Sequence, residues 1–148
     1  MNKSTSSLNF PDVNVWMALL LENHAHRKAA RLWWRAAEAT IAFTRFTQIS
    51  VLRLLTTAAA MDGKPLSLDE AWRAYDRLFA DERVALMREP PEVESRFRQN
   101  TRGRSASPKL WADAWLLAFA QSTDGILVTL DRTLAARSPC CLLLQDLP

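Results

Sequence analysis

Short apolar runs alternate with longer stretches of helical periodicity along this chain. The apolar runs predict β-strands at 8–11, 40–43, 84–87, 126–130 and 140–144. The stretches between them predict helices at 13–22, 27–38, 47–59, 67–79, 92–99 and 110–122. Successive parallel strands need a crossover, which is usually a helix, so this alternation predicts an α/β fold with a mostly parallel sheet.

Polar residues mark where several of these elements begin and end. Ser67 and Glu70 form a capping-box pattern, which predicts a helix that starts at this serine. Thr47 is the expected N-cap of the 47–59 helix. A turn is expected at 62–65, and a polar, basic loop at 100–109.

Composition changes this picture little. The chain has 148 residues, of which 49% are hydrophobic, and no domain boundary is apparent, so one domain is expected over 1–148. A net charge of +3 permits a nucleic-acid partner without requiring one. The polar start of the chain lacks the apolar core of a signal peptide, and the apolar run at 13–21 is too short to span a bilayer. A cytoplasmic location is therefore expected.

Three aspartates stand where the pattern needs an explanation. Asp12 lies between the first strand and the first helix, and Asp131 directly follows the apolar run at 126–130. Either carboxylate can serve as a helix N-cap. Asp113 is the one charged residue in the apolar segment 110–120, where an isolated carboxylate is costly unless an arginine or another group compensates it.

The sheet topology offers a common function for these aspartates. If the strands before Asp12 and Asp131 are neighbours, both carboxylates meet at the carboxyl edge of the sheet, where ligands bind in open α/β folds. The helix with Asp113 can add a third carboxylate. Clustered carboxylates repel one another, and a hard divalent cation removes that repulsion. Such a site suits hydrolysis of phosphodiesters.

The order of several segments resembles the PIN-domain ribonucleases of the VapC toxin type. The resemblance covers nearly the whole chain, and it rests on the segments 11–19, 23–26 with Trp33-Trp34, 47–56, 112–120 and 127–132. It implies a three-layer α/β/α sandwich around a short, mostly parallel sheet. It also implies an RNA-cleaving enzyme that uses Mg²⁺ or Mn²⁺, forms a homodimer and is inhibited by a small antitoxin.

The resemblance assigns metal ligation to Asp12, Asp113 and Asp131. Many relatives have an acid where this chain has Gln48, whose amide oxygen can still bind a hard cation but brings no charge. The substitution motivates an alternative function, a catalytically weak or silent domain that binds RNA or protein. Two other acids are candidate substitutes, though a solvated surface position is the commoner role for each: Glu38 and Asp124.

Polar residues beside the aspartates are candidates for supporting roles. Asn14 can hydrogen-bond the Asp12 carboxylate or the turn around it. Thr129 points to the same side of its strand as Asp131. Arg132 can meet a substrate phosphate or pair with an acid.

Basic residues gather just before the helix that carries Asp113. Arg102, Arg104 and Lys109 belong to this stretch, which is either a solvated loop or a surface that holds the RNA backbone. His24 and His26 have no acidic or thiol partners in register, so a loop role is favoured over a metal site. No Gly-rich loop follows a strand, which disfavours a nucleotide-binding module.

Overall fold

The computed structural model describes residues 8–145 and contains one five-stranded sheet in that range. Its strands are β1 (Leu8–Pro11), β2 (Thr40–Phe43), β3 (Val84–Leu86), β4 (Ile126–Thr129) and β5 (Cys141–Leu143). Their order in the sheet is β3-β2-β1-β4-β5, and every neighbouring pair is parallel. The α/β prediction is confirmed, and the sheet is wholly parallel.

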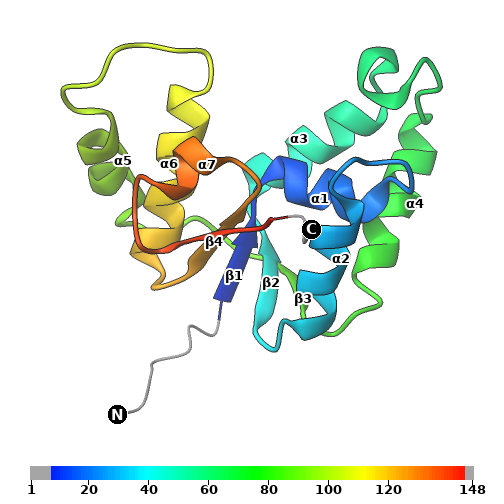
Figure 1. Cartoon of the computed structure of the whole chain (residues 1–148), viewed down its shortest axis with the longest axis horizontal. Helices are drawn as coiled ribbons and strands as arrows, with labels where there is room; N and C mark the ends of the chain where they lie inside the picture. Colours follow the sequence, from blue (N-terminus) through cyan, green and yellow to red (C-terminus); the bar gives the residue numbers. More distant parts are fainter. Residues whose placement is uncertain (1–7, 146–148) are drawn as a thin grey trace.

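Helices cover both faces of this sheet (Figure 1). They are α1 (Val13–Leu20), α2 (Arg27–Ala36), α3 (Arg45–Leu55), α4 (Leu68–Leu78), α5 (Val93–Thr101), α6 (Leu110–Ser122) and α7 (Arg132–Ala135), with a 3₁₀ turn, η1, at Ala58–Met61. On β2, Ala42 packs in the cluster with residues of α5 and α6, whereas Ile41 and Phe43 pack with residues of α1, α3 and α4. Because successive side chains of a strand point to opposite faces, this division produces the expected three-layer sandwich.

The first helices begin directly at the carboxyl ends of their strands. Asp12 caps α1, accepting a hydrogen bond from the Val15 N–H at 3.0 Å. Thr44 caps α3, and its hydroxyl and that of Thr47 bond each other's backbone N–H groups in a capping box. The expectation that Thr47 is the cap is therefore wrong by three positions, because both residue types satisfy the same N–H groups and the sequence does not distinguish them.

Other boundaries differ modestly from the sequence pattern. The Ser67–Glu70 capping box is confirmed at the start of α4. The helix α5 continues to Thr101, into the expected loop. The short helix α7 was not expected, because four residues are too few to show a periodic pattern.

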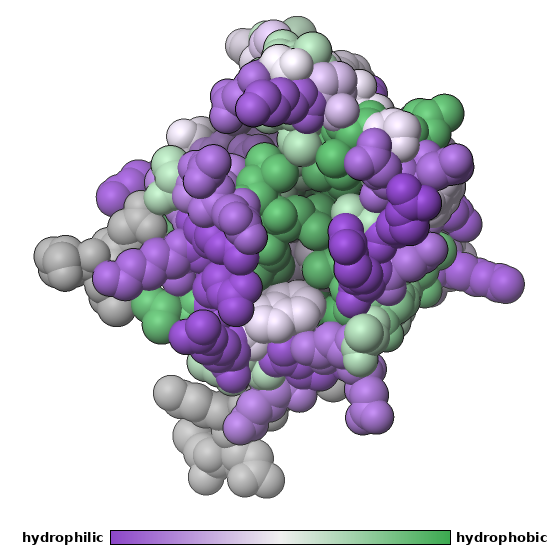
Figure 2. All heavy atoms as spheres, turned by 90° about the vertical axis from the view of Figure 1, so that its right-hand side faces the viewer, coloured by the Kyte–Doolittle hydropathy of each residue, from purple (hydrophilic) through white to green (hydrophobic). Residues whose placement is uncertain are grey.

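The side of the molecule formed by α4 carries apolar surface in a hollow between hydrophilic ridges (Figure 2). On α4, Leu68 and Trp72 are exposed hydrophobic residues. Within residues 8–145, no helix is both long enough and apolar enough to cross a membrane.

Candidate active site

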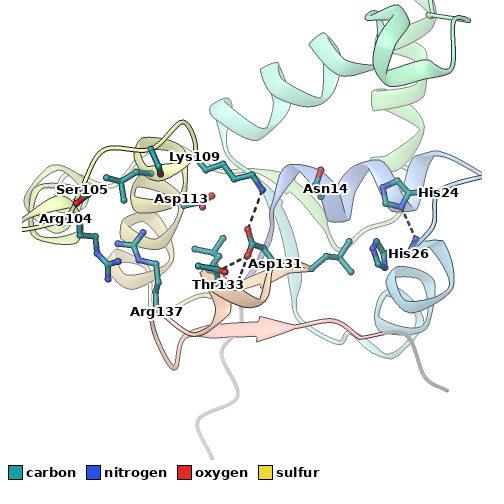
Figure 3. A pocket seen from close by; sticks show the side chains of 14 residues that line it. Asn14, His24, His26, Arg104, Ser105, Lys109, Asp113, Asp131, Thr133 and Arg137 are labelled. Carbon is teal, nitrogen blue, oxygen red and sulfur yellow. Dashed lines mark hydrogen bonds and ion pairs between the residues drawn. The ribbon is translucent and has the colours of Figure 1, made fainter.

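A cleft of about 1040 Å³ opens at the carboxyl edge of the sheet. The segments that line it come from the start of α1, the turn before α2, the loop before α6, the first turn of α6, and α7 (Figure 3). Asp113 and Asp131 are both in its lining, although they are 18 positions apart in sequence. Ligands bind at this edge in open α/β sheets, so the cleft is the candidate active site.

Asp12 is not among the residues that line this cleft, but it directly follows β1 at the same edge of the sheet. Its strand β1 pairs directly with β4, and the Asp12 N–H donates to the Val128 carbonyl at 2.9 Å. The residue is only 8% exposed, and Thr129 donates its hydroxyl hydrogen to Oδ2 of the carboxylate. The pKa of Asp12 is raised to about 6, mainly by burial and to a smaller extent by Asp113 and Asp131, while the bonds from Thr129 and Val15 oppose the rise.

Asp131 is fixed by its position at the start of α7. Its Oδ1 accepts from the N–H groups of Thr133 at 2.8 Å and Leu134 at 3.2 Å. Its own N–H donates to the Thr129 hydroxyl at 3.0 Å. Its Oδ2 lies 3.6 Å from the Lys109 ammonium. Asp131 therefore caps a helix and also lies at the carboxyl edge of the sheet, as Asp12 does. From the sequence, these two roles were alternatives.

Asp113 differs from the other two because it makes no hydrogen bond or ion pair through its carboxylate within residues 8–145. It lies in the first turn of α6, an otherwise apolar helix. Burial and the nearby Asp131 raise its pKa, and Lys109 and Arg137 partly oppose this rise. No structural role among the described residues therefore accounts for this carboxylate.

The three aspartates fit a hard divalent cation by their chemistry. Asp12 is influenced electrostatically by both other carboxylates, and burial makes the negative charge of Asp12 and of Asp113 costly. The Lys109 ammonium is the cation that contacts Asp131, at a position between α6 and α7. However, among residues 8–145 no three His, Cys, Asp or Glu side chains are already arranged as a metal-binding cluster. The donors are present, and their assembly around an ion stays a prediction.

Gln48 lies outside the cleft lining. It is buried on α3, and its Oε1 accepts a hydrogen bond from Arg45 Nη1 at 2.6 Å. Its side chain also hydrogen-bonds Tyr75 on α4. The structure therefore gives Gln48 polar partners on its own side of the sheet and does not place it with Asp113 and Asp131. Glu38 and Asp124 are exposed and are also absent from the cleft lining.

The supporting residues expected from the sequence divide into two groups. Asn14, Arg104 and Lys109 line the cleft, and Thr129 does not line it but bonds Asp131, which does. Arg102 and Arg132 do not line it. The exposed Arg102 instead lines a separate cavity of about 490 Å³ between α5 and α6.

The two histidines lie at the far end of the cleft from Arg104 (Figure 3). The His26 N–H donates to Nδ1 of His24 at 3.1 Å, which stabilises the turn before α2. Burial, with a smaller contribution from His26, lowers the pKa of His24. This contact matches the loop role favoured from the sequence, and the position in the cleft was not expected.

Arg137 is a cleft residue that the sequence did not single out. It follows α7, and no charged residue stands next to it in the sequence to indicate a functional site. It lines the cleft only because α7 turns the chain back toward α5, where Arg137 Nη2 donates to the Asn100 carbonyl at 2.6 Å. No local signal could have found it.

The geometry and the sequence were compared with known proteins. The family model described as PIN domain matches residues 10–138, which contain all three aspartates. This chain belongs to the PIN-domain family. Within this family, a curated relative is Ribonuclease VapC41 of Mycobacterium tuberculosis, 41% identical over 126 residues that cover 81% of this chain and 86% of the relative.

Solved structures of toxins share this PIN-domain fold. The crystal structure of Mycobacterium tuberculosis VapC20, described as a sarcin-ricin loop cleaving toxin, aligns with a TM-score of 0.63 and 16% identity, over 86% of this chain and 93% of that one. A toxin-antitoxin complex from Klebsiella pneumoniae aligns with a TM-score of 0.62 and 17% identity, over 94% and 99%. At these identities the likeness supports the fold alone.

Proposed function

We propose that this PIN-domain protein is an endoribonuclease and the toxin component of a toxin–antitoxin pair. The observation that carries the proposal is the grouping of Asp12, Asp113 and Asp131 at one edge of the sheet, beside a cleft with basic residues on one flank. Acids that hold a cation and bases that hold phosphates are both needed to cleave a nucleic-acid backbone. The 41% identity to a protein named a ribonuclease supports RNA as the substrate.

We further propose that Asp12, Asp113 and Asp131 hold Mg²⁺, with Mn²⁺ as an alternative. When bound, the ion would activate water and offset the charge that develops on the phosphate. The protein's own part is to hold the carboxylates ready: Thr129 orients Asp12, and the N–H groups at the start of α7 orient Asp131. Metal binding would also remove the electrostatic cost that raises the pKa of Asp12 and Asp113.

The proposal also includes a cognate antitoxin, a homodimer and a cytoplasmic location. A cognate antitoxin is supported by the toxin-antitoxin complex among the similar folds. The apolar hollow beside α4, with Leu68 and Trp72 exposed, offers a surface for an apolar antitoxin segment (Figure 2). Homodimer formation and a cytoplasmic location are part of the same proposal; Phe46 and Ile49, exposed on α3, are candidate residues for the homodimer contact.

Gln48 favours a second candidate function, a catalytically weak or silent domain that binds RNA or protein. The amide brings no charge, and Arg45 and Tyr75 already bond it. The two functions differ in one outcome. An enzyme cleaves RNA as the purified wild-type chain, whereas a binding module retains RNA without cleaving it.

The test is to incubate the purified protein with total RNA and Mg²⁺ and to determine the ends of the products. Hydrolysis through a metal-activated water is expected to leave a 5′-phosphate and a 3′-hydroxyl. Cyclic phosphate ends, or cleavage that survives EDTA, would contradict the proposal. RNA that is bound but intact would favour the second function.

A further inference from the structure

Two arginines lie together on one flank of the cleft. Arg104 and Arg137 both line it, and their guanidinium groups lie next to each other in Figure 3. They come from different parts of the chain: Arg104 precedes α6, and Arg137 follows α7. The same cleft contains Asp113 and Asp131, so the basic flank directly adjoins the acidic centre.

Arg137 is held in place by a defined set of contacts. Its Nη2 donates to the Asn100 carbonyl at 2.6 Å. Asn100 is in turn fixed to α6, since its amide donates to the Ala114 carbonyl at 3.1 Å and to Gln121 Oε1 at 3.0 Å. The guanidinium therefore starts from a rigid position, and little conformational entropy is lost when it meets a ligand.

Arg104 is placed by a turn that requires glycine. The residue before it, Gly103, has a φ of +72°, in the left-handed region that other residues adopt at a cost. The Arg104 N–H closes this turn on the Thr101 carbonyl at 3.3 Å. The turn ends α5 and directs the chain along the cleft, which brings Arg104 to Arg137.

The arrangement places two positive charges side by side; within residues 8–145 the Asp113 carboxylate acts electrostatically on Arg137 without forming an ion pair with it. Within residues 8–145, neither guanidinium makes an ion pair with a carboxylate. The Nε of Arg137 is buried and has no hydrogen-bond partner among the described residues. Burial lowers the pKa of Arg137, and Arg104 lowers it further, so the two charges repel each other. A shared anion would offset that repulsion.

We propose that Arg104 and Arg137 form a binding site for one phosphate of the RNA backbone, adjacent to the phosphate at the carboxylates. The inference rests on the proposed function and deepens it. Guanidinium groups match phosphate oxygens in geometry, and two of them can hold one phosphate from two sides. A backbone that repeats phosphates along a strand can occupy this site and the acidic centre at once.

A phosphate bound at this arginine pair determines which bond of the RNA is cut. A phosphate held at Arg104 and Arg137 fixes the RNA along the cleft, since phosphate contacts set register while carrying no sequence information. The scissile phosphate then falls at the carboxylates at a set distance from the anchored one. The pair therefore positions the substrate and takes no part in the chemistry itself.

Binding of a fluorescein-labelled eight-nucleotide single-stranded RNA, followed by anisotropy in EDTA over a salt series, tests the site. Arg104→Gln is the main variant, because this exposed side chain has no structural bond to lose. We expect it to weaken RNA binding about fivefold at low salt and to reduce the slope of log Kd against log salt by about 0.7. Arg102→Gln is the matched control, with the same charge change two positions away and outside the cleft; it is expected to change binding less than twofold.

Arg137→Gln is measured beside it, with a thermal melt to confirm that it folds. If both arginines hold one phosphate, the double variant weakens binding by less than the product of the single effects. In cleavage assays, Arg104→Gln is expected to raise KM and to leave kcat within about twofold.

Equal losses in Arg104→Gln and Arg102→Gln would overturn the inference, because they would indicate diffuse charge. If Arg104→Gln binds the RNA as tightly as wild type but binds a poly-glutamate peptide more weakly, the inference is overturned in favour of a protein partner. These outcomes are distinguished from a failure of the proposed function by the cleavage of total RNA. If the wild-type protein cleaves RNA, the enzyme works and only the role of Arg104 and Arg137 is wrong.

Discussion

Thr129 donates its hydroxyl hydrogen to Oδ2 of Asp12, although the two residues are 117 positions apart in sequence. The same hydroxyl oxygen accepts the Asp131 N–H at 3.0 Å. Thr129 is fully buried at the end of β4, the strand that pairs with β1. One side chain therefore links two of the proposed ligands and sets how they lie relative to each other.

Replacing this hydroxyl should impair the enzyme through Asp12. Thr129→Val removes a bond that lowers the pKa of Asp12, so the pKa should rise above its value of about 6. We expect RNA cleavage at pH 7 to fall about tenfold and the acid limb of the pH–rate profile to move to higher pH. Thr129→Ser retains the hydroxyl and should keep the wild-type profile. A Thr129→Val profile that coincides with that of wild type would show that the bond does not tune Asp12.

The raised pKa of Asp12 predicts how stability depends on pH. The pKa is 3.8 in the unfolded chain and about 6 in the folded protein, so the folded state binds more protons between these values. The contribution of Asp12 to stability is therefore present below about pH 4 and is lost as the pH rises through 6. In EDTA, the Asp12→Asn variant should gain on the order of 2–3 kcal/mol relative to wild type between pH 4 and pH 7.5.

Urea unfolding of both proteins at a series of pH values measures this difference. Asp76→Asn is the control, because Asp76 is exposed on α4 and lies outside the cleft lining. This variant measures the effect of removing an exposed carboxylate, and the pH dependence of Asp12→Asn should exceed it. A parallel pair of curves for Asp12→Asn and wild type would contradict the electrostatic cost assigned to Asp12.

Gln48 provides a test of the charge at the site. Gln48→Glu adds a carboxylate, but the Arg45 guanidinium that now bonds Oε1 would neutralise part of its charge. We therefore expect only a modest improvement: the Mg²⁺ concentration needed for half-maximal cleavage should fall about threefold. Gln48→Met, which keeps the approximate shape without an oxygen, is the matched control. Cleavage that appears only in the Gln48→Glu variant would mean that the wild-type chain is a silent domain.

The sequence predicted the parts of this site that depend on strand ends. Asp12 and Asp131 follow apolar runs, and parallel strands bring such positions to one edge of the sheet, so the pattern predicted that they meet if their strands are neighbours, and β1 and β4 do pair. Asp113 stood out because a single charge in an apolar helix needs a reason. The α/β fold followed from the alternation of the same runs with helical periods.

The rest depends on contacts that no local pattern encodes. Arg137 reaches the cleft through a bond to Asn100, 37 positions away, and Gln48 bonds Arg45 within its own helix and Tyr75 on the neighbouring α4. Thr44 and Thr47 are equally good caps by residue type, so only the backbone geometry separates them. The helix α7 has only four residues, too few to show a repeated hydrophobic period, and it begins at the cap formed by Asp131.

The proposed function requires that the three carboxylates hold a divalent cation and that the protein cleaves RNA with it. Asp113→Asn tests it most cleanly, because within residues 8–145 this carboxylate bonds no other group and its loss should not weaken the fold. The measurement is a titration of Mg²⁺ or Mn²⁺ that follows the thermal unfolding midpoint and RNA cleavage in the same samples. Wild type and the Asp76→Asn control should gain several degrees in unfolding midpoint and cleave RNA, whereas Asp113→Asn should gain little and lose cleavage on the order of 100-fold. Equal stabilisation and equal cleavage by wild type and Asp113→Asn would contradict the account.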